Sequence, residues 1–137
     1  LKKEKAFVII EEPEAHLYPN LQNKVVAFIA YFANVNESSI MVTTHSPYVL
    51  TSVNALYCAG KTIQEFPDLK KKVYDIIGNG CEIFPDKVMA LKIEKDTSIQ
   101  NLINDEYGEL NTEMIDEISD RVNEKYTELF YLLTEKE

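Results

Sequence analysis

Two short stretches of the chain end in side chains that could do chemistry. In the first, the apolar residues 6–10 lead directly into Glu11 and Glu12, and Glu14 follows after a proline. A buried strand that ends in carboxylates places them at the carboxyl edge of a parallel sheet, where α/β proteins bind ligands. One carboxylate can hold Mg²⁺, which prefers oxygen ligands, and the other can orient or deprotonate an attacking water. Because successive strand residues face opposite ways, Glu11 and Glu12 are predicted to have different roles.

The second stretch carries a histidine in the equivalent place. The apolar residues 39–43 are followed by Thr44, His45 and a Ser46-Pro47 pair that is typical of a helix start. Parallel strands joined by one helix are neighbours, so His45 is predicted to reach the same sheet edge as Glu12. A histidine there can donate to a phosphate oxygen or position a water.

Taken singly, these residues leave plainer interpretations open. The acids Glu11, Glu12 and Glu14 also suit a solvated charge cluster at a strand end. His45 also suits a turn residue bonded to the backbone, and His16 a histidine that packs in the turn before a helix. Only the combination of the two stretches favours a catalytic edge.

The elements that would position these residues alternate between strand and helix. Strands are predicted at 6–10, where consecutive apolar residues indicate burial on both faces, and at 39–43 and 54–58. Between the first two, Pro19 opens a helix with an apolar stripe made of Leu21, Val25, Phe28, Ile29 and Phe32. A short helix is predicted from Ser46 toward Ser52. This alternation predicts an α/β layered fold with a mainly parallel sheet flanked by helices.

The rest of the chain is predicted to hold a helix over 67–77 that ends at Gly78, a strand over 88–93 and a long amphipathic helix from Asn111. The last helix is predicted to place six large side chains on one stripe: Ile115, Ile118, Val122, Tyr126, Leu129 and Leu133. We expect one domain over 1–137. It divides into a core over 1–59, a variable connection over 60–86 and a C-terminal strand and acidic helix over 87–137.

The net charge of −9 is concentrated at the C-terminal end. Residues from Asn104 onward include eleven acids and three bases, whereas residues 1–103 are nearly balanced. An acidic segment repels phosphates, so this piece is not expected to bind nucleic acid by itself.

Other sequence features narrow the class of protein. No apolar run approaches the roughly 20 residues that span a bilayer, so no membrane association is expected. Cys58 and Cys81 share no close spacing with each other or with either histidine, which argues against a zinc site and a disulfide framework and suits a reducing cytoplasm. Because the first residue is leucine, the chain is expected to be part of a longer protein.

The two stretches together resemble the C-terminal half of ABC-type ATPases, most closely the RecF/SMC/OLD-like branch with its E-P-E-A-H-L-x-P pattern. The resemblance covers about residues 6–52 and implies a partial P-loop NTPase layer that uses ATP and Mg²⁺. It assigns Glu11 to the Walker B metal position, Glu12 to the catalytic base and His45 to the switch histidine that senses the γ-phosphate. It also assigns Ala15, His16 and Leu17 to the D-loop, which crosses a dimer interface in such proteins.

The chain departs from this family pattern at two positions. Glu11 stands where aspartate is more usual, so its metal contact could run through a bridging water. Tyr18 stands where the branch often has histidine, which bears on the D-loop contact and not on the chemistry. Neither a P-loop nor a signature loop precedes Glu11. The near-match over 55–62 lacks the first glycine of G-x-x-x-x-G-K-[ST] and is interpreted as a strand with Gly60-Lys61-Thr62 as its exit turn.

The resemblance therefore implies a parent ATPase whose P-loop lies in a missing N-terminal lobe and which dimerises head to tail on ATP. This chain alone is expected to be inactive, and nucleic acid could contact the parent only through other segments. Two alternatives stay open. One is a non-catalytic interaction module that uses the acidic C-terminal helix. The other is a metal-dependent nuclease built on Glu11, Glu12 and Glu14, which lacks further Asp-x-Asp spacing and a basic groove.

Overall fold

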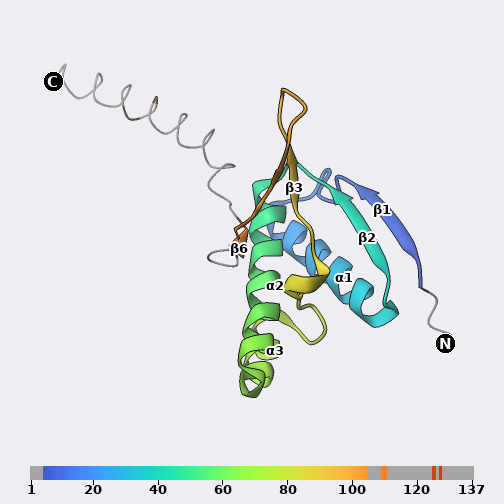
Figure 1. The fold of residues 1–137 in the computed structure, drawn as a ribbon, viewed down its shortest axis with the longest axis vertical. Coiled ribbons are helices and arrows are strands. Elements are labelled where there is room, and N and C mark those ends of the chain that lie inside the picture. Colours follow the sequence, from blue (N-terminus) through green and yellow to red (C-terminus); the bar gives the residue numbers. More distant parts are fainter. Residues whose placement is uncertain (1–4, 105–108, 111–124, 126, 128–137) are drawn as a thin grey trace.

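A parallel strand–helix–strand unit forms the N-terminal part of the chain. The structure is a computed structural model that describes residues 5–104, 109–110, 125 and 127. Strand β1 (Phe7–Glu11) is followed by helix α1 (Pro19–Asn36) and strand β2 (Ser39–Thr43), and the two strands pair in parallel (Figure 1). The predicted strands over 6–10 and 39–43 and the helix start at Pro19 are confirmed, because each carries a strong local signal: β-branched runs for the strands and proline in the first helical turn.

The next element, helix α2 (Pro47–Glu65), is longer than the sequence predicted. Its start is confirmed, since the Ser46 side chain caps the helix by accepting a hydrogen bond from the Val49 amide. The predicted end near Ser52 and the predicted strand over 54–58 are wrong, because the helix continues through both. Gly60-Lys61-Thr62 is therefore helical and is not an exit turn. In a helix the backbone amides donate to carbonyls of the same helix, so they are not available to bind phosphate. This stretch therefore does not form a phosphate loop either.

Smaller elements complete the described chain. A short 3₁₀ turn, η1 (Pro67–Leu69), leads into helix α3 (Lys70–Ile77). The helix ends at Gly78, which has a φ of 89°, so the predicted end of the helix over 67–77 is confirmed. After a second 3₁₀ turn, η2 (Pro85–Lys87), four short strands follow: β3 (Leu91–Ile93), β4 (Ile99–Asn101), β5 (Ile103–Asn104) and β6 (Glu109–Leu110). The predicted strand over 88–93 is thus reduced to its last three residues.

The sheet is less extensive than expected. Within the described residues β1 pairs with β2 in parallel, whereas β3 with β4 and β5 with β6 form antiparallel pairs. The α/β class is confirmed, and the mainly parallel sheet is represented by one strand pair. The six residues of the predicted C-terminal apolar stripe lie outside the described residues.

The core lies between the helices. Val26 and Ala30 of α1 pack with Val49 and Leu56 of α2, and a second cluster joins α2 to α3 through Ile63 and Val73. Residues 80–84 close this core from the side. The Asn34 side-chain amide donates to the carbonyls of Gly80 (2.9 Å) and Glu82 (2.7 Å), and the Ile83 amide donates to the Leu56 carbonyl (3.0 Å).

Two apolar surfaces remain exposed, contrary to the predicted burial of β1 on both faces. Phe7, Ile9 and Met41 share one face of the β1–β2 pair and are 69%, 58% and 50% exposed. On α1, three residues of the predicted stripe, Leu21, Phe28 and Phe32, are also exposed, because the helix packs on α2 through Gln22, Val26 and Ala30 instead. None of the described helices is long and apolar enough to cross a membrane.

We predict that Gly60→Ala destabilises the chain, the reverse of the usual effect in a helix. A Cβ at residue 60 would lie 2.1 Å from the Ile83 carbonyl oxygen, so α2 and residues 80–84 would have to separate. Overpacking of this kind costs about 1–3 kcal/mol. At the exposed Ala55 of the same helix, Ala55→Gly should cost about 1 kcal/mol through helix propensity alone. Urea unfolding measures both, and a Gly60→Ala variant as stable as the parent would contradict the close approach.

Candidate functional site

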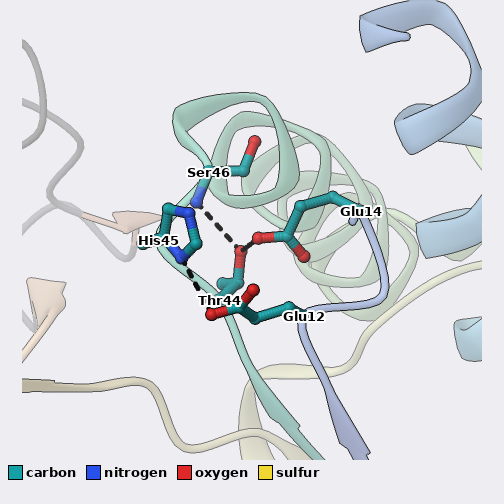
Figure 2. Close-up of polar contacts among 5 residues, drawn as sticks. All are labelled: Glu12, Glu14, Thr44, His45 and Ser46. Atoms are coloured by element: carbon teal, nitrogen blue, oxygen red, sulfur yellow. Dashed lines mark hydrogen bonds and ion pairs between the residues drawn. The ribbon is translucent and has the colours of Figure 1, made fainter. Parts of the chain in front are cut away.

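The loops that leave β1 and β2 meet at one sheet edge. Glu11 pairs with Thr43 in the register, and the Glu12 amide donates to the Thr43 carbonyl (2.8 Å), so the strands stay together up to the point where both chains turn away. Beyond that point, Glu12 Oε1 lies 3.3 Å from His45 Nδ1 (Figure 2). The two side chains are 53% and 79% exposed, so both are open to a ligand. The structure thus brings together the carboxylate and the histidine for which the family resemblance implies catalytic roles.

The turn after β1 is tightly folded. Glu12 and His16 both have left-handed backbones, with φ of 45° and 64°. The Ala15 amide donates to the Glu12 carbonyl and the Leu17 amide to the Glu14 carbonyl, each at 2.9 Å. Ala15 and His16 are exposed, and Leu17 is half-buried. The three predicted D-loop residues therefore form a surface turn directly beside the Glu12–His45 pair, and His16 does not pack inside the turn.

Glu14 has a different environment from its neighbours. It is only 7% exposed, and one carboxylate oxygen, Oε1, accepts a hydrogen bond from the Thr44 hydroxyl at 2.5 Å (Figure 2). The Thr44 hydroxyl in turn accepts from the Ser46 amide at 3.0 Å. The other oxygen, Oε2, is buried and has no hydrogen-bond partner among the described residues. This carboxylate therefore lies inside the junction of the two loops and not in a solvated cluster.

A second set of hydrogen bonds links the same loops to α1. The Ser46 hydroxyl donates to Gln22 Oε1 (2.7 Å), and the Gln22 amide nitrogen donates to the Leu17 carbonyl (3.0 Å). Both Ser46 and Gln22 are buried. Sequence reasoning identified Ser46 as a helix cap but missed Gln22. A polar residue among the apolar positions of α1, one turn after Pro19, was the available signal.

The environment of Glu14 favours its charged form. Burial by itself raises the pKa of this carboxyl, but the hydrogen bond from Thr44, the nearby backbone N–H groups of Glu14 and His45, and the charge of His45 outweigh burial. The net result is a pKa below the ordinary value of 4.5.

Glu11 stands apart from this junction. It is exposed at the end of β1 and, by strand alternation, shares the outer face with Phe7 and Ile9. No group of three or more acids, histidines or cysteines within the described part of the chain is arranged to hold a metal ion. The nuclease cluster of Glu11, Glu12 and Glu14 is therefore not formed, because Glu14 is bonded to Thr44 inside the loop junction.

Comparison with known proteins shows a similarity in the N-terminal part of the chain. Residues 1–50 match the family model of the AAA ATPase domain. The N-terminal part of the chain is similar to an ATPase domain. The match includes β1, α1, β2 and both loops of the site, and it supports an ATP-binding, ATP-hydrolysing type of domain. No curated protein matches the chain, and no solved structure does.

ATPase domains generally use ATP together with a magnesium ion. Mg²⁺ keeps several waters and is commonly bound through one or two carboxylates together with phosphate oxygens. The Glu11 carboxylate is exposed at this edge and is of the chemical type that binds this ion.

We predict that Glu14 makes the chain acid-sensitive. Because its pKa is lower in the folded chain than in the unfolded chain, its stabilisation is fully present above pH 4.5 and is lost as the pH falls through the folded-state value. The Glu14 side-chain ¹³C resonance should titrate below 4.5. In Thr44→Val the pKa should rise, because burial is then opposed by fewer hydrogen bonds, and urea unfolding should become less pH-dependent between pH 7 and pH 3. A Glu14 that titrates above 4.5 in the parent chain would contradict this account.

Proposed function

We propose that this chain is the C-terminal part of a Mg²⁺-dependent ATP-hydrolysing domain of the ABC/RecF/SMC-like type. The observation that carries the proposal is the Glu12–His45 pair, 3.3 Å apart at the ends of two parallel strands, within the segment that matches an ATPase family model. Carboxyl ends of parallel strands are where α/β folds bind nucleotides.

In the proposed mechanism each edge residue has one role. The Glu12 carboxylate orients the attacking water and accepts its proton. His45 places Nδ1 3.3 Å from the Glu12 carboxylate, and Nε2, on the other side of the ring, donates to a γ-phosphate oxygen. Glu11 helps to hold Mg²⁺, which neutralises charge on the phosphates when bound. The left-handed backbone at Glu12 supports this division, because it turns residue 12 away from the strand direction that Glu11 follows.

The proposal also includes a lobe that carries the P-loop. Parallel sheets are normally covered on both faces, and a two-stranded sheet is marginal by itself. Here Phe7, Ile9 and Met41 form an uncovered apolar face, and Leu21, Phe28 and Phe32 form an uncovered stripe on α1. We propose that the lobe adds strands beside β1 and buries both surfaces. The chain alone is then inactive, because no described segment offers a phosphate-binding loop.

We also propose that the parent protein forms a homodimer and is cytoplasmic. The exposed turn formed by Ala15, His16 and Leu17 lies beside the catalytic pair, which suits a D-loop in a head-to-tail homodimer on ATP. Cys58 and Cys81 are free thiols, in keeping with a cytoplasmic protein. The alternative of an interaction module depends on the acidic C-terminal helix, which lies outside the described residues, and gains no support from the described part.

We predict that Glu12→Gln in the full-length protein separates binding from hydrolysis. The amide keeps the size of the side chain but cannot accept a proton, so hydrolysis should fall about 10²-fold or more while ATP affinity is retained. Steady-state phosphate release and ATP titration measure the two effects. Asp75→Asn, at an exposed position of α3, is the matched control and should keep the parental rate. A Glu12→Gln protein with the parental rate would exclude Glu12 as the base.

We predict that Ile9→Lys weakens association with the P-loop lobe. Burial of an isoleucine side chain contributes about 1.5–3 kcal/mol, so the Kd between this chain and the separately produced lobe should rise about 10- to 100-fold. Ile76→Lys changes an equally apolar residue on α3, 82% exposed, and should leave the Kd unchanged. Calorimetry measures both, with far-UV circular dichroism to verify folding. An equal rise in Kd for the two variants, or no rise for Ile9→Lys, would contradict docking on the β1–β2 face.

A further inference from the structure

Two carboxylates of the same turn have opposite surroundings. The side chain of Glu12 is half exposed and faces His45, whereas Glu14, two residues later, is 7% exposed. A buried carboxylate is costly unless hydrogen bonds compensate its lost hydration. The Thr44 hydroxyl supplies the side-chain hydrogen bond to Glu14, and it comes from the other loop of the site. The buried acid therefore connects the two loops that carry the catalytic pair.

His45 is held through its neighbours in sequence. Its own side chain is exposed, and its ion-pair partner within the described residues is Glu12. Thr44 on one side is bonded to Glu14, and Ser46 on the other side is bonded to Gln22 and donates its amide to the Thr44 hydroxyl. The backbone of residue 45 is thus fixed from both sides by hydrogen bonds that lead back to the β1–α1 connection.

We propose that Glu14 is a positioning residue that, through the Thr44 hydroxyl, fixes the loop carrying His45 relative to Glu12. The catalytic meaning of this role rests on the proposed function, but the positioning itself does not. Glu14 is two residues from Glu12, and Thr44 adjoins His45, so few rotatable bonds separate the link from the pair. The backbone hydrogen bonds Ala15–Glu12 and Leu17–Glu14 stiffen the segment between Glu12 and Glu14.

Stability alone gives a poor account of Glu14. Its Oε2 is buried without a hydrogen-bond partner in the described part of the chain, and an unpaired buried acceptor is destabilising. Replacement of buried polar pairs by apolar residues is often neutral or stabilising, whereas such pairs can specify one arrangement of the chain. A directional bond between Glu14 and Thr44 selects one relative placement of the loops, which an apolar contact would not do.

The test compares three hydroxyl variants of the 137-residue chain by NMR. Thr44→Val removes the donor with little change of shape, Thr44→Ser keeps it, and Thr43→Val removes an exposed hydroxyl one residue away. Thr44→Val should shift the amide resonances of residues 12 and 14–16, in the opposite loop, together with the His45 ring resonances. Thr44→Ser should retain the parental pattern, and Thr43→Val should shift only its strand neighbours.

Glu14→Leu gives the reciprocal test and covers the case in which Thr44→Val does not fold. It removes the acceptor of the Thr44 hydroxyl and should shift the amide resonances of residues 44–46, whereas Asp75→Leu, at an exposed position of α3, should not. If a folded Thr44→Val leaves the amides of residues 12 and 14–16 and the His45 ring unchanged, or if a folded Glu14→Leu leaves residues 44–46 unchanged, the positioning role is overturned.

Hydrolysis by the full-length protein separates this inference from the proposed function. A misplaced pair should lower kcat of Thr44→Val about 10- to 100-fold with the KM for ATP nearly constant, and Thr44→Ser should restore kcat. If the NMR shifts appear but kcat is unchanged, positioning stands and the catalytic roles of Glu12 and His45 are overturned. If the shifts do not appear, positioning is overturned even where Glu12→Gln abolishes hydrolysis.

Discussion

The parallel register of β1 and β2 is the constraint on which the site depends. With Glu11 opposite Thr43 and one further backbone hydrogen bond from Glu12, both strands end at the same level. The two loops therefore begin side by side although about thirty residues separate them in the sequence. A shift of the register by two residues would move His45 some 6–7 Å along the strand, beyond reach of Glu12. The distance between Glu12 and His45 therefore depends first on the pairing of the strands and only then on the side-chain conformations.

Hydrogen bonds connect the helices to the two loops of the site. Their core is built where α1, α2 and α3 meet, and the polar residues Gln22 and Ser46 lie buried at its end nearest the sheet edge. One serine thus caps α2, bonds to α1 and adjoins His45. Packing of the helices and placement of the loop that carries His45 are consequently coupled through a few hydrogen bonds.

The sequence was sufficient for the elements whose signals are local. Proline in the first turn of α1 and α2, the Ser46 cap and the β-branched runs located β1, α1 and β2, and the order of these elements was enough to bring Glu12 and His45 together. It failed over 54–58, where a short apolar run that includes Leu56 and Tyr57 was assigned to a buried strand, but both residues are buried by packing of a helix. It also could not distinguish the environments of Glu12 and Glu14, because spacing along a turn does not reveal which carboxylate faces inward. That difference arises from the left-handed residues and from a hydrogen bond to a residue thirty positions away.

The left-handed backbone at Glu12 limits which amino acids this position can tolerate. With φ at 45°, glycine, asparagine and aspartate are the least strained replacements, whereas valine or isoleucine would be strongly disfavoured. For the proposed general base, glycine lacks a carboxylate, asparagine lacks a sufficiently basic acceptor, and aspartate is one methylene shorter. Backbone conformation and chemistry thus exclude different sets of residues, and few satisfy both. Variation among natural sequences at this position should accordingly be narrower than exposure of the side chain alone would suggest.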